Sequence, residues 1–82
     1  MIQKVEPITS DGMYQRGMDY FDGRNGFQQD KFEAFRYFLK AAEQGHIKAM
    51  EKVADCYKYG WGVVQDDYQA RRWQTKYLDA NW

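Results

Sequence analysis

The chain has 82 residues, with 12 Lys and Arg against 12 Asp and Glu, one Cys, one His, and an aromatic share of 18%. This length fits one small domain, and the formal charge of zero excludes the basic excess of proteins that bind nucleic acids or anionic membranes. A single Cys excludes an internal disulfide framework.

The N-terminal segment, residues 1–9, contains no apolar run of the kind found in signal peptides. No stretch of the chain approaches the ~20 apolar residues that a membrane span requires. We therefore expect a soluble, cytoplasmic protein that does not bind membranes. Pro7 biases the residue before it towards extended backbone, so this segment is predicted to be extended.

Two copies of one unit follow, and together they fill residues 13–80. Each copy has a helical pattern, a glycine-bounded turn and a second helical pattern. The matched pairs along the two copies are Gly17 and Ala54, Tyr20 and Tyr57, Gly23 and Gly60, Gly26 and Gly62, Asp30 and Asp66, Ala34 and Ala70, Tyr37 and Trp73, and Lys40 and Lys76. We predict a single domain with repeat 1 at 10–45 and repeat 2 at 46–82.

The helix boundaries follow from capping signals. Thr9, Ser10 and Asp11 offer N-cap oxygens, and Gly23 suits the left-handed residue that ends a helix. The two second helices begin with the spacing of a capping box, in which an acidic N-cap is followed three residues later by Glu or Gln. These boxes are Asp30 with Glu33 and Asp66 with Gln69, and Gly45 ends the helix that starts near Asp30. No segment shows strand-like alternation, so the chain is predicted to be all-α.

Helical periodicity separates the expected core from the surface. The helix of repeat 2 that precedes Gly60 carries an apolar stripe at i, i+3, i+4 and i+7. This stripe consists of Met50, Val53, Ala54 and Tyr57, and its counterparts in repeat 1 are Met13, Gly17 and Tyr20. We assign these positions to packing. Arg16 matches Val53, which indicates that the first helix is less covered there.

The spaced residues of both copies resemble the Sel1-like repeat. Repeat 2 carries Tyr57, Gly60, Gly62, Val63, Asp66, Ala70, Trp73 and Lys76, and repeat 1 carries Gly17, Tyr20, Gly23, Gly26, Asp30, Ala34, Lys40, Ala41, Ala42 and Gly45. Sel1-like repeats are similar to tetratricopeptide repeats. The resemblance implies a short right-handed α-solenoid of four helices whose concave face binds other proteins, with Trp73 at an aromatic core position.

The last helix differs from its counterpart in repeat 1. Phe35, Phe38 and Leu39 of repeat 1 become Arg71, Gln74 and Thr75 in repeat 2, and Ala41 and Ala42 become Tyr77 and Leu78. Terminal repeats need a polar outer face because no neighbour buries them. We therefore expect a capping helix here and an array that is complete at two repeats.

The sequence predicts no catalytic residue, no metal site and no cofactor. Ser10 is at a predicted helix cap, and His46 follows the glycine that ends a helix, so a catalytic triad is disfavoured. Cys56 is expected either as a small buried hydrophobe or at a half-exposed groove position. One Cys and one His cannot form a zinc site.

A second stripe runs beside the core stripe of each first helix, and the resemblance implies that it lines the concave face. Its members are Gln15, Met18, Asp19 and Asp22 in repeat 1, and Lys52, Asp55, Cys56 and Tyr59 in repeat 2. Met18 and Tyr59 are typical of binding anchors, whereas the charged members fit a solvated surface equally well. Trp61 is expected either to pack on the next loop or to stand exposed. Trp82 is either a lid over the last helix or part of a self-association patch.

These observations predict a non-catalytic module, such as an adaptor, inhibitor or immunity-type regulator, that binds a protein or peptide through its concave face. The alternative is a homodimeric scaffold assembled through exposed rings near Trp61, Tyr77 and Trp82. A third possibility is a β-lactam-binding enzyme of the cysteine-rich Sel1-like branch. The single Cys56 argues against it, because that branch has paired cysteines in each repeat.

Overall fold

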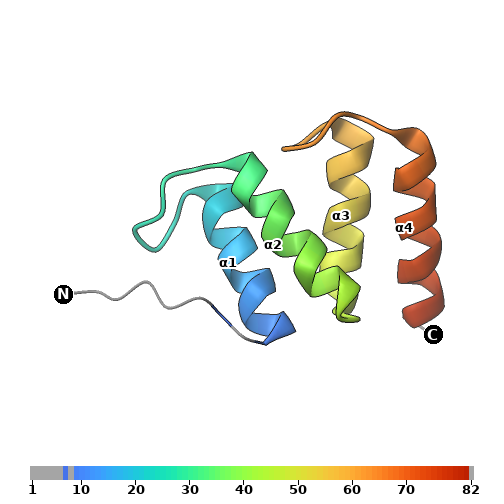
Figure 1. The fold of residues 1–82 in the computed structure, drawn as a ribbon, viewed down its shortest axis with the longest axis horizontal. Coiled ribbons are helices and arrows are strands. Elements are labelled where there is room, and N and C mark those ends of the chain that lie inside the picture. The colour runs from blue at the N-terminus through green and yellow to red at the C-terminus, as the bar shows by residue number, and fades with distance from the viewer. Residues whose placement is uncertain (1–6, 8, 82) are drawn as a thin grey trace.

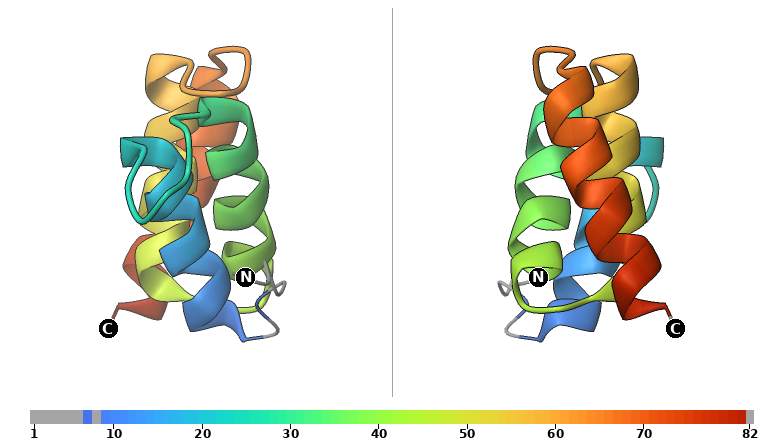
Figure 2. Two further views of the ribbon diagram at one scale, coloured as in Figure 1. Left: turned by 90° about the vertical axis from the view of Figure 1, so that its left-hand side faces the viewer. Right: turned by 90° about the vertical axis from the view of Figure 1, so that its right-hand side faces the viewer.

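The computed structural model describes residues 7 and 9–81, and this part of the chain forms four helices and no strand. The helices are α1 (Ser10–Asp22), α2 (Lys31–Glu43), α3 (Ile47–Tyr59) and α4 (Asp67–Ala80), and they stand side by side in chain order (Figure 1). Seen from the α1 end, α1 and α3 lie on one side of the array and α2 lies on the other (Figure 2). The all-α prediction and the two helix pairs are confirmed.

The predicted caps start and end the helices with two differences, one of which is that α2 ends at Glu43 with Gln44 as its C-cap, one residue before the predicted Gly45. Thr9 has extended backbone angles and its Oγ1 accepts a bond of 3.0 Å from the Gly12 N–H, while Gly23 ends α1 with φ of 68°. Asp30 accepts from the Glu33 N–H at 3.1 Å. Its own N–H, however, donates to the carbonyl of Tyr20 at 2.8 Å. The rest of the predicted extended segment, apart from Pro7, lies outside the described residues.

The second helix of repeat 2 begins in the same way. Asp66 accepts from the Gln69 N–H at 3.1 Å, and its N–H donates to the Tyr57 carbonyl at 2.9 Å. In each repeat, the N-cap N–H thus donates to a carbonyl of the preceding helix and not to the Glu or Gln side chain of a capping box. The predicted capping boxes are therefore only half formed.

His46 caps α3 and connects it to α1. Its Nδ1 accepts from the Ala49 N–H at 3.2 Å, so the ring carries its hydrogen on Nε2, which lies 3.1 Å from Oδ1 of Asp11. The His46 ring also stacks on Tyr14, with centroids 4.8 Å apart. The imidazole is thus occupied by structural contacts.

The core lies between the two helix pairs. It is built from small and aromatic side chains, namely Ala34, Phe35, Phe38, Ala41, Ala42, Ala49, Val53 and Cys56. Met13, Tyr20, Met50, Tyr57 and Trp73 are partly buried against this cluster, and Gly17 and Ala54 are buried. The residues that the periodicity assigns to packing are confirmed in that role, as is the structural role of Trp73.

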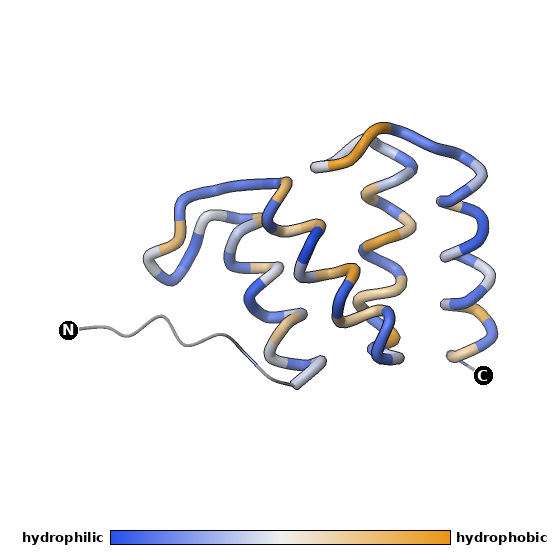
Figure 3. Tube along the Cα trace, viewed as in Figure 1, coloured by the Kyte–Doolittle hydropathy of each residue, from blue (hydrophilic) through white to orange (hydrophobic). Residues whose placement is uncertain are grey.

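The two ends of the array carry polar groups. On α4, the side chains of Arg71, Gln74 and Thr75 are exposed, and most of this helix is hydrophilic (Figure 3). On α1, the guanidinium of Arg16 lies 4.7 Å from the centre of the Phe27 ring and so covers an aromatic surface at this end. Within the described part of the chain, no helix combines the length and hydropathy needed to cross a bilayer.

Candidate functional site

The structure separates the members of the predicted binding stripe. Cys56 is fully buried, and Met18 is partly buried against the same core. Burial raises the pKa of the Cys56 thiol to about 12. The expectation that Cys56 contacts a partner is corrected, because α3 packs against both α2 and α4 and its Cys56 flank faces the interior. The alternative expectation, a small buried hydrophobe, is the one confirmed.

The acidic members of the stripe on α1 organise the turn that follows this helix. Oδ1 of Asp19 accepts a bond of 2.8 Å from Nδ2 of Asn25, and Asp22 forms an ion pair with Arg24. Gln15 is exposed on the same helix. Trp82 lies outside the described residues. Asp19 and Asp22 are thus already engaged by the chain itself.

Two of the predicted residues, Lys52 and Trp61, contact the ring of Phe21, and a third, Tyr59, contacts Trp61. The Trp61 ring packs edge-on against Phe21 with centroids 5.2 Å apart, and it lies 4.8 Å from the ring of Tyr59. Nζ of Lys52 lies 4.9 Å from the Phe21 centroid. Nζ of Lys31 approaches the same ring at 3.5 Å and donates to the Phe21 carbonyl at 3.3 Å. Trp61 therefore packs on the preceding repeat.

Gly62 allows this arrangement by bringing the turn after α3 against the start of α2. Its φ is +73°, and a Cβ at this position would lie 2.0 Å from the carbonyl oxygen of Lys31. Only a glycine permits that approach in this backbone conformation. The turn after α3 therefore reaches back to α2, as the ribbon shows (Figure 1).

An apolar pocket of about 410 Å³ opens where the turn meets α2. It is lined by Lys31, Phe32, Gly60, Trp61, Gly62, Val63 and Val64. Phe32 is 71% exposed, Val64 is 85% exposed and the neighbouring Tyr59 is 55% exposed, and a hydrophobic stretch of this turn is visible in Figure 3. We refer to Phe32, Tyr59, Trp61, Val63 and Val64 as the Trp61 patch.

Sequence reasoning identified Tyr59 and Trp61 but missed Phe32 and Val64 as binding candidates. One signal was available for Phe32, because it matches Tyr68 in repeat 2, and both are aromatic at a position just inside a helix start. The two are equally exposed, at 71% and 69%. No comparable signal exists for Val64, whose repeat 1 counterpart is Gln28.

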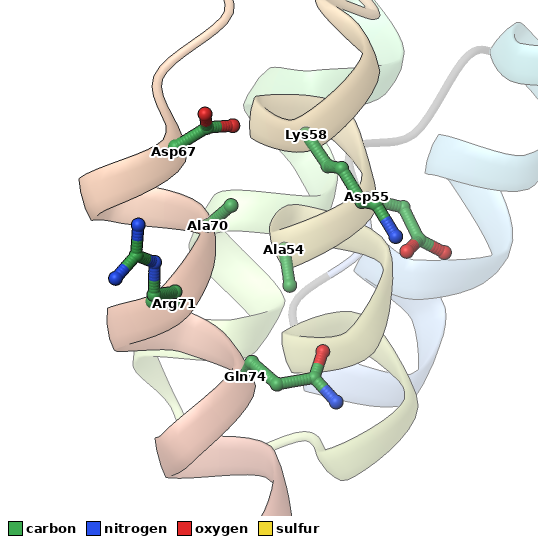
Figure 4. A pocket seen from close by; sticks show the side chains of 7 residues that line it. All are labelled: Ala54, Asp55, Lys58, Asp67, Ala70, Arg71 and Gln74. Carbon is green, nitrogen blue, oxygen red and sulfur yellow. The ribbon is translucent and has the colours of Figure 1, made fainter.

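A second hollow, of about 290 Å³, lies between α3 and α4 (Figure 4). It is lined by Ala54, Asp55, Lys58, Asp67, Ala70, Arg71 and Gln74. The repeat 1 counterparts are Gly17, Met18, Phe21, Lys31, Ala34, Phe35 and Phe38, several of which bury their side chains against the core that α3 completes. The predicted site residue Asp55 belongs to this mixed-charge hollow and is separate from the Trp61 patch.

Neither hollow contains a recognisable catalytic arrangement. Cys56 lies in the core and His46 caps α3, and among residues 7 and 9–81 no three His, Cys, Asp or Glu side chains converge on a point that could hold a metal ion. The Trp61 patch offers aromatic and aliphatic surface beside the ammonium groups of Lys31, Lys52 and Lys58. Such a surface can bind a ligand by burial and charge.

Comparison with known proteins agrees with the geometry. The family described as Sel1 repeat matches residues 10–46 and 47–76. The chain is 33% identical over 54 residues to the ERAD-associated E3 ubiquitin-protein ligase component HRD3A of Arabidopsis thaliana, an alignment that covers 66% of the chain and 8% of HRD3A. No solved structure matches the chain.

Two further relatives come from a bacterium and from humans. The chain is 43% identical over 47 residues to the exopolysaccharide production negative regulator of Rhizobium leguminosarum bv. viciae. This alignment covers 57% of the chain and 16% of that protein. It is 49% identical over 39 residues to human protein sel-1 homolog 2, covering 48% of the chain and 6% of that protein. The chain thus spans a small part of each relative. The two matched units and the observed helix pairs show that this chain belongs to the Sel1 repeat family.

Proposed function

We propose that this Sel1 repeat domain is a non-catalytic protein-interaction module of the adaptor, inhibitor or regulator type, and that it binds its partner through the Trp61 patch. The observation that carries the proposal is the exposure of Phe32, Tyr59 and Val64 around Trp61. Contiguous exposed apolar side chains mark interaction surfaces, and Trp and Tyr are enriched among residues that dominate binding energy.

The relatives support an interaction role in general terms. HRD3A is named as a component of a ubiquitin-protein ligase, and the Rhizobium protein is named as a negative regulator. The word component implies that HRD3A assembles with other proteins.

The test is affinity capture with the tagged full chain, followed by identification of the captured proteins and a direct measurement of affinity. We expect Trp61→Ala with Tyr59→Ala to weaken binding of the partner at least about tenfold, since truncated interface anchors typically cost more than 1 kcal/mol. Tyr68→Ala is the matched control, because Tyr68 is an exposed ring that does not line the pocket. Unchanged affinity in the double variant would contradict the proposal.

Self-association is the second candidate, and the exposed Leu78 on α4 favours it. A homodimer through this end of the array would double the mass of 9.8 kDa. Light scattering at micromolar concentration distinguishes the two functions. We expect the monomer mass, and a dimer that Leu78→Ser dissociates would support the scaffold instead.

A further inference from the structure

Among the ammonium groups beside the Trp61 patch, those of Lys31 and Lys52 form no ion pair with a carboxylate of the described residues. Lys31 contacts the Phe21 ring and the Phe21 carbonyl, and it lies 5.9 Å from the Trp61 centroid. Nζ of Lys52 lies 4.9 Å from the centre of the same Phe21 ring. Both ammonium groups lie over the Phe21 ring, and Lys31 uses one of its three N–H donors on the Phe21 carbonyl, which leaves donors on each ammonium for a carboxylate of a ligand.

The carboxylates of neighbouring elements are directed to other contacts. Asp22 pairs with Arg24, and Asp19 accepts from Asn25. Asp30 caps α2. Asp55 and Asp67 line the hollow between α3 and α4. Lys31 and Lys52 thus take part in none of the ion pairs formed among the described residues, and they lie beside the exposed apolar side chains of the Trp61 patch.

We infer that the Trp61 patch binds a short acidic segment of a partner protein that carries one or two large apolar side chains. The apolar side chains enter the pocket between Phe32, Trp61 and Val64, and carboxylates of the segment pair with Lys31 and Lys52. Apolar burial supplies the affinity, and the charges select acidic over basic segments. This inference rests on the proposed function and specifies the chemistry of the partner.

The pocket lining favours a peptide over other anionic ligands. Valine side chains and a phenylalanine line it together with Trp61, which suits aliphatic or aromatic side chains. Binding of a nucleic acid strand or an anionic membrane relies on an extended basic surface. Here the lysines beside the patch, among the described residues, are Lys31, Lys52 and Lys58, and the chain has no basic excess.

The first experiment is an NMR titration of the isotopically labelled full chain with a short synthetic peptide in which leucine and phenylalanine are flanked by glutamates. Two matched peptides replace the glutamates with lysines or the apolar pair with serines. We expect the acidic-apolar peptide to shift the Trp61 indole N–H and the amides of Phe32 and Val64. Each matched peptide should bind at least about tenfold more weakly, and added salt should weaken the acidic peptide's binding.

The second experiment uses paired variants of the chain. Phe32→Ser should reduce affinity for the acidic-apolar peptide at least about tenfold, while Tyr68→Ser, at the equivalent and equally exposed position of repeat 2, should leave it unchanged. Lys52→Gln should weaken binding, and Lys76→Gln should not. Lys76 is a suitable control because its ammonium also lies over a ring, at 4.7 Å from the Trp73 centroid.

Three results would overturn the inference. These are equal affinity for the lysine peptide, shifts that map away from the Trp61 patch, and tighter binding of oligothymidine or of phosphatidylserine vesicles than of the acidic peptide. Failure of the inference is distinct from failure of the proposed function. A captured protein that requires Trp61 while the acidic peptide does not bind would uphold the function and reject this partner chemistry.

Discussion

Gly17 on α1 lies directly against the ring of Phe38 on α2. A Cβ at Gly17 would lie 2.6 Å from Cε1 of Phe38 and 3.3 Å from the carbonyl oxygen of Ala34. In repeat 2 the equivalent residue is Ala54, and the equivalent of Phe38 is Gln74. Repeat 1 therefore pairs a glycine with a buried aromatic ring, and repeat 2 pairs an alanine with a glutamine. The exposed glutamine leaves room for the methyl group of Ala54, whereas the Phe38 ring leaves none at Gly17.

Gly17→Ala should therefore destabilise the protein. Overpacking typically costs about 1–3 kcal/mol, and replacing a helical Gly by Ala returns up to about 1 kcal/mol. We expect a net loss of about 1–2 kcal/mol in the free energy of unfolding, measured by urea denaturation followed by circular dichroism. Phe38→Leu removes the ring with which the new methyl group would clash. The double variant Gly17→Ala with Phe38→Leu should therefore have a higher free energy of unfolding than Phe38→Leu alone, by part of the gain in helix propensity. A single variant as stable as the parent would refute the packing argument.

Gly62 and Gly26 form a natural test of the turn that carries Trp61. Both have positive φ, at +73° and +84°, but a Cβ at Gly26 meets nothing within 4 Å whereas one at Gly62 meets the Lys31 backbone. Gly26→Ala should cost about 1–2 kcal/mol for its left-handed conformation. Gly62→Ala should cost a further 2–4 kcal/mol, roughly, because backbone must move.

The same pair of variants also reports on the patch. In Gly62→Ala the turn can no longer lie against α2, so the fluorescence and the indole resonance of Trp61 should change. Gly26→Ala should leave both signals as they are. Equal destabilisation by the two substitutions would show that the contact between Gly62 and Lys31 is unimportant for the turn.

The thiol of Cys56 should be inert in the folded protein. It is fully buried and its pKa is raised by burial to about 12, so the reactive thiolate is scarce at neutral pH. We expect a disulfide reagent at pH 8 to label the native chain at least about 100-fold more slowly than the urea-unfolded chain. Rapid labelling without denaturant would show that Cys56 is accessible.

Cys56 should also contribute a pH dependence of stability in the alkaline range. The unfolded thiol loses its proton near its ordinary pKa of 9.0, while the folded thiol keeps it up to about 12. Between these values the folded state binds more protons, so stability falls as pH rises, by up to about 1.4 kcal/mol per pH unit from this group. Cys56→Ala should show a shallower decline over pH 9–12, and parallel declines would contradict the assignment.

The polar face of α4 should keep this end of the array from associating. Arg71 and Thr75 stand where repeat 1 has Phe35 and Leu39, so Arg71→Phe with Thr75→Leu recreates an apolar face without neighbours. Exposed apolar faces of this kind promote association. Light scattering should show a mass that rises with concentration. The control, Arg72→Phe with Thr75→Leu, places the ring elsewhere on the helix and should associate less.

Helix pairs, caps and core were predictable because each depends on local or repeated signals. Gly23, Asp30 and Asp66 are recognisable from capping preferences, and Val53 and Tyr57 from helical periodicity. The reciprocal half of the capping box was not predictable. The N–H groups of Asp30 and Asp66 bond to carbonyls of the preceding helix, a contact that only the packed pair creates.

The candidate site was only partly predictable, because it is assembled from segments that are distant in sequence. Helical periodicity predicts one buried face on α3. In the structure α2 and α4 pack against two sides of α3, so a wider part of this helix is buried and Cys56 lies in the core. Phe32 and Val64 line one pocket because Gly62 brings the turn against the start of α2. A contact of this kind leaves no pattern within either segment.

The bonds from Asp30 to Tyr20 and from Asp66 to Tyr57 also bear on how the chain folds. The second helix of each repeat obtains a complete start only when the first helix of that repeat is already in place. The smallest cooperative unit is then the helix pair, and single helices are poor folding intermediates. In native-state hydrogen exchange, the Asp30 amide should open together with the end of α1, and the Asp66 amide together with the end of α3.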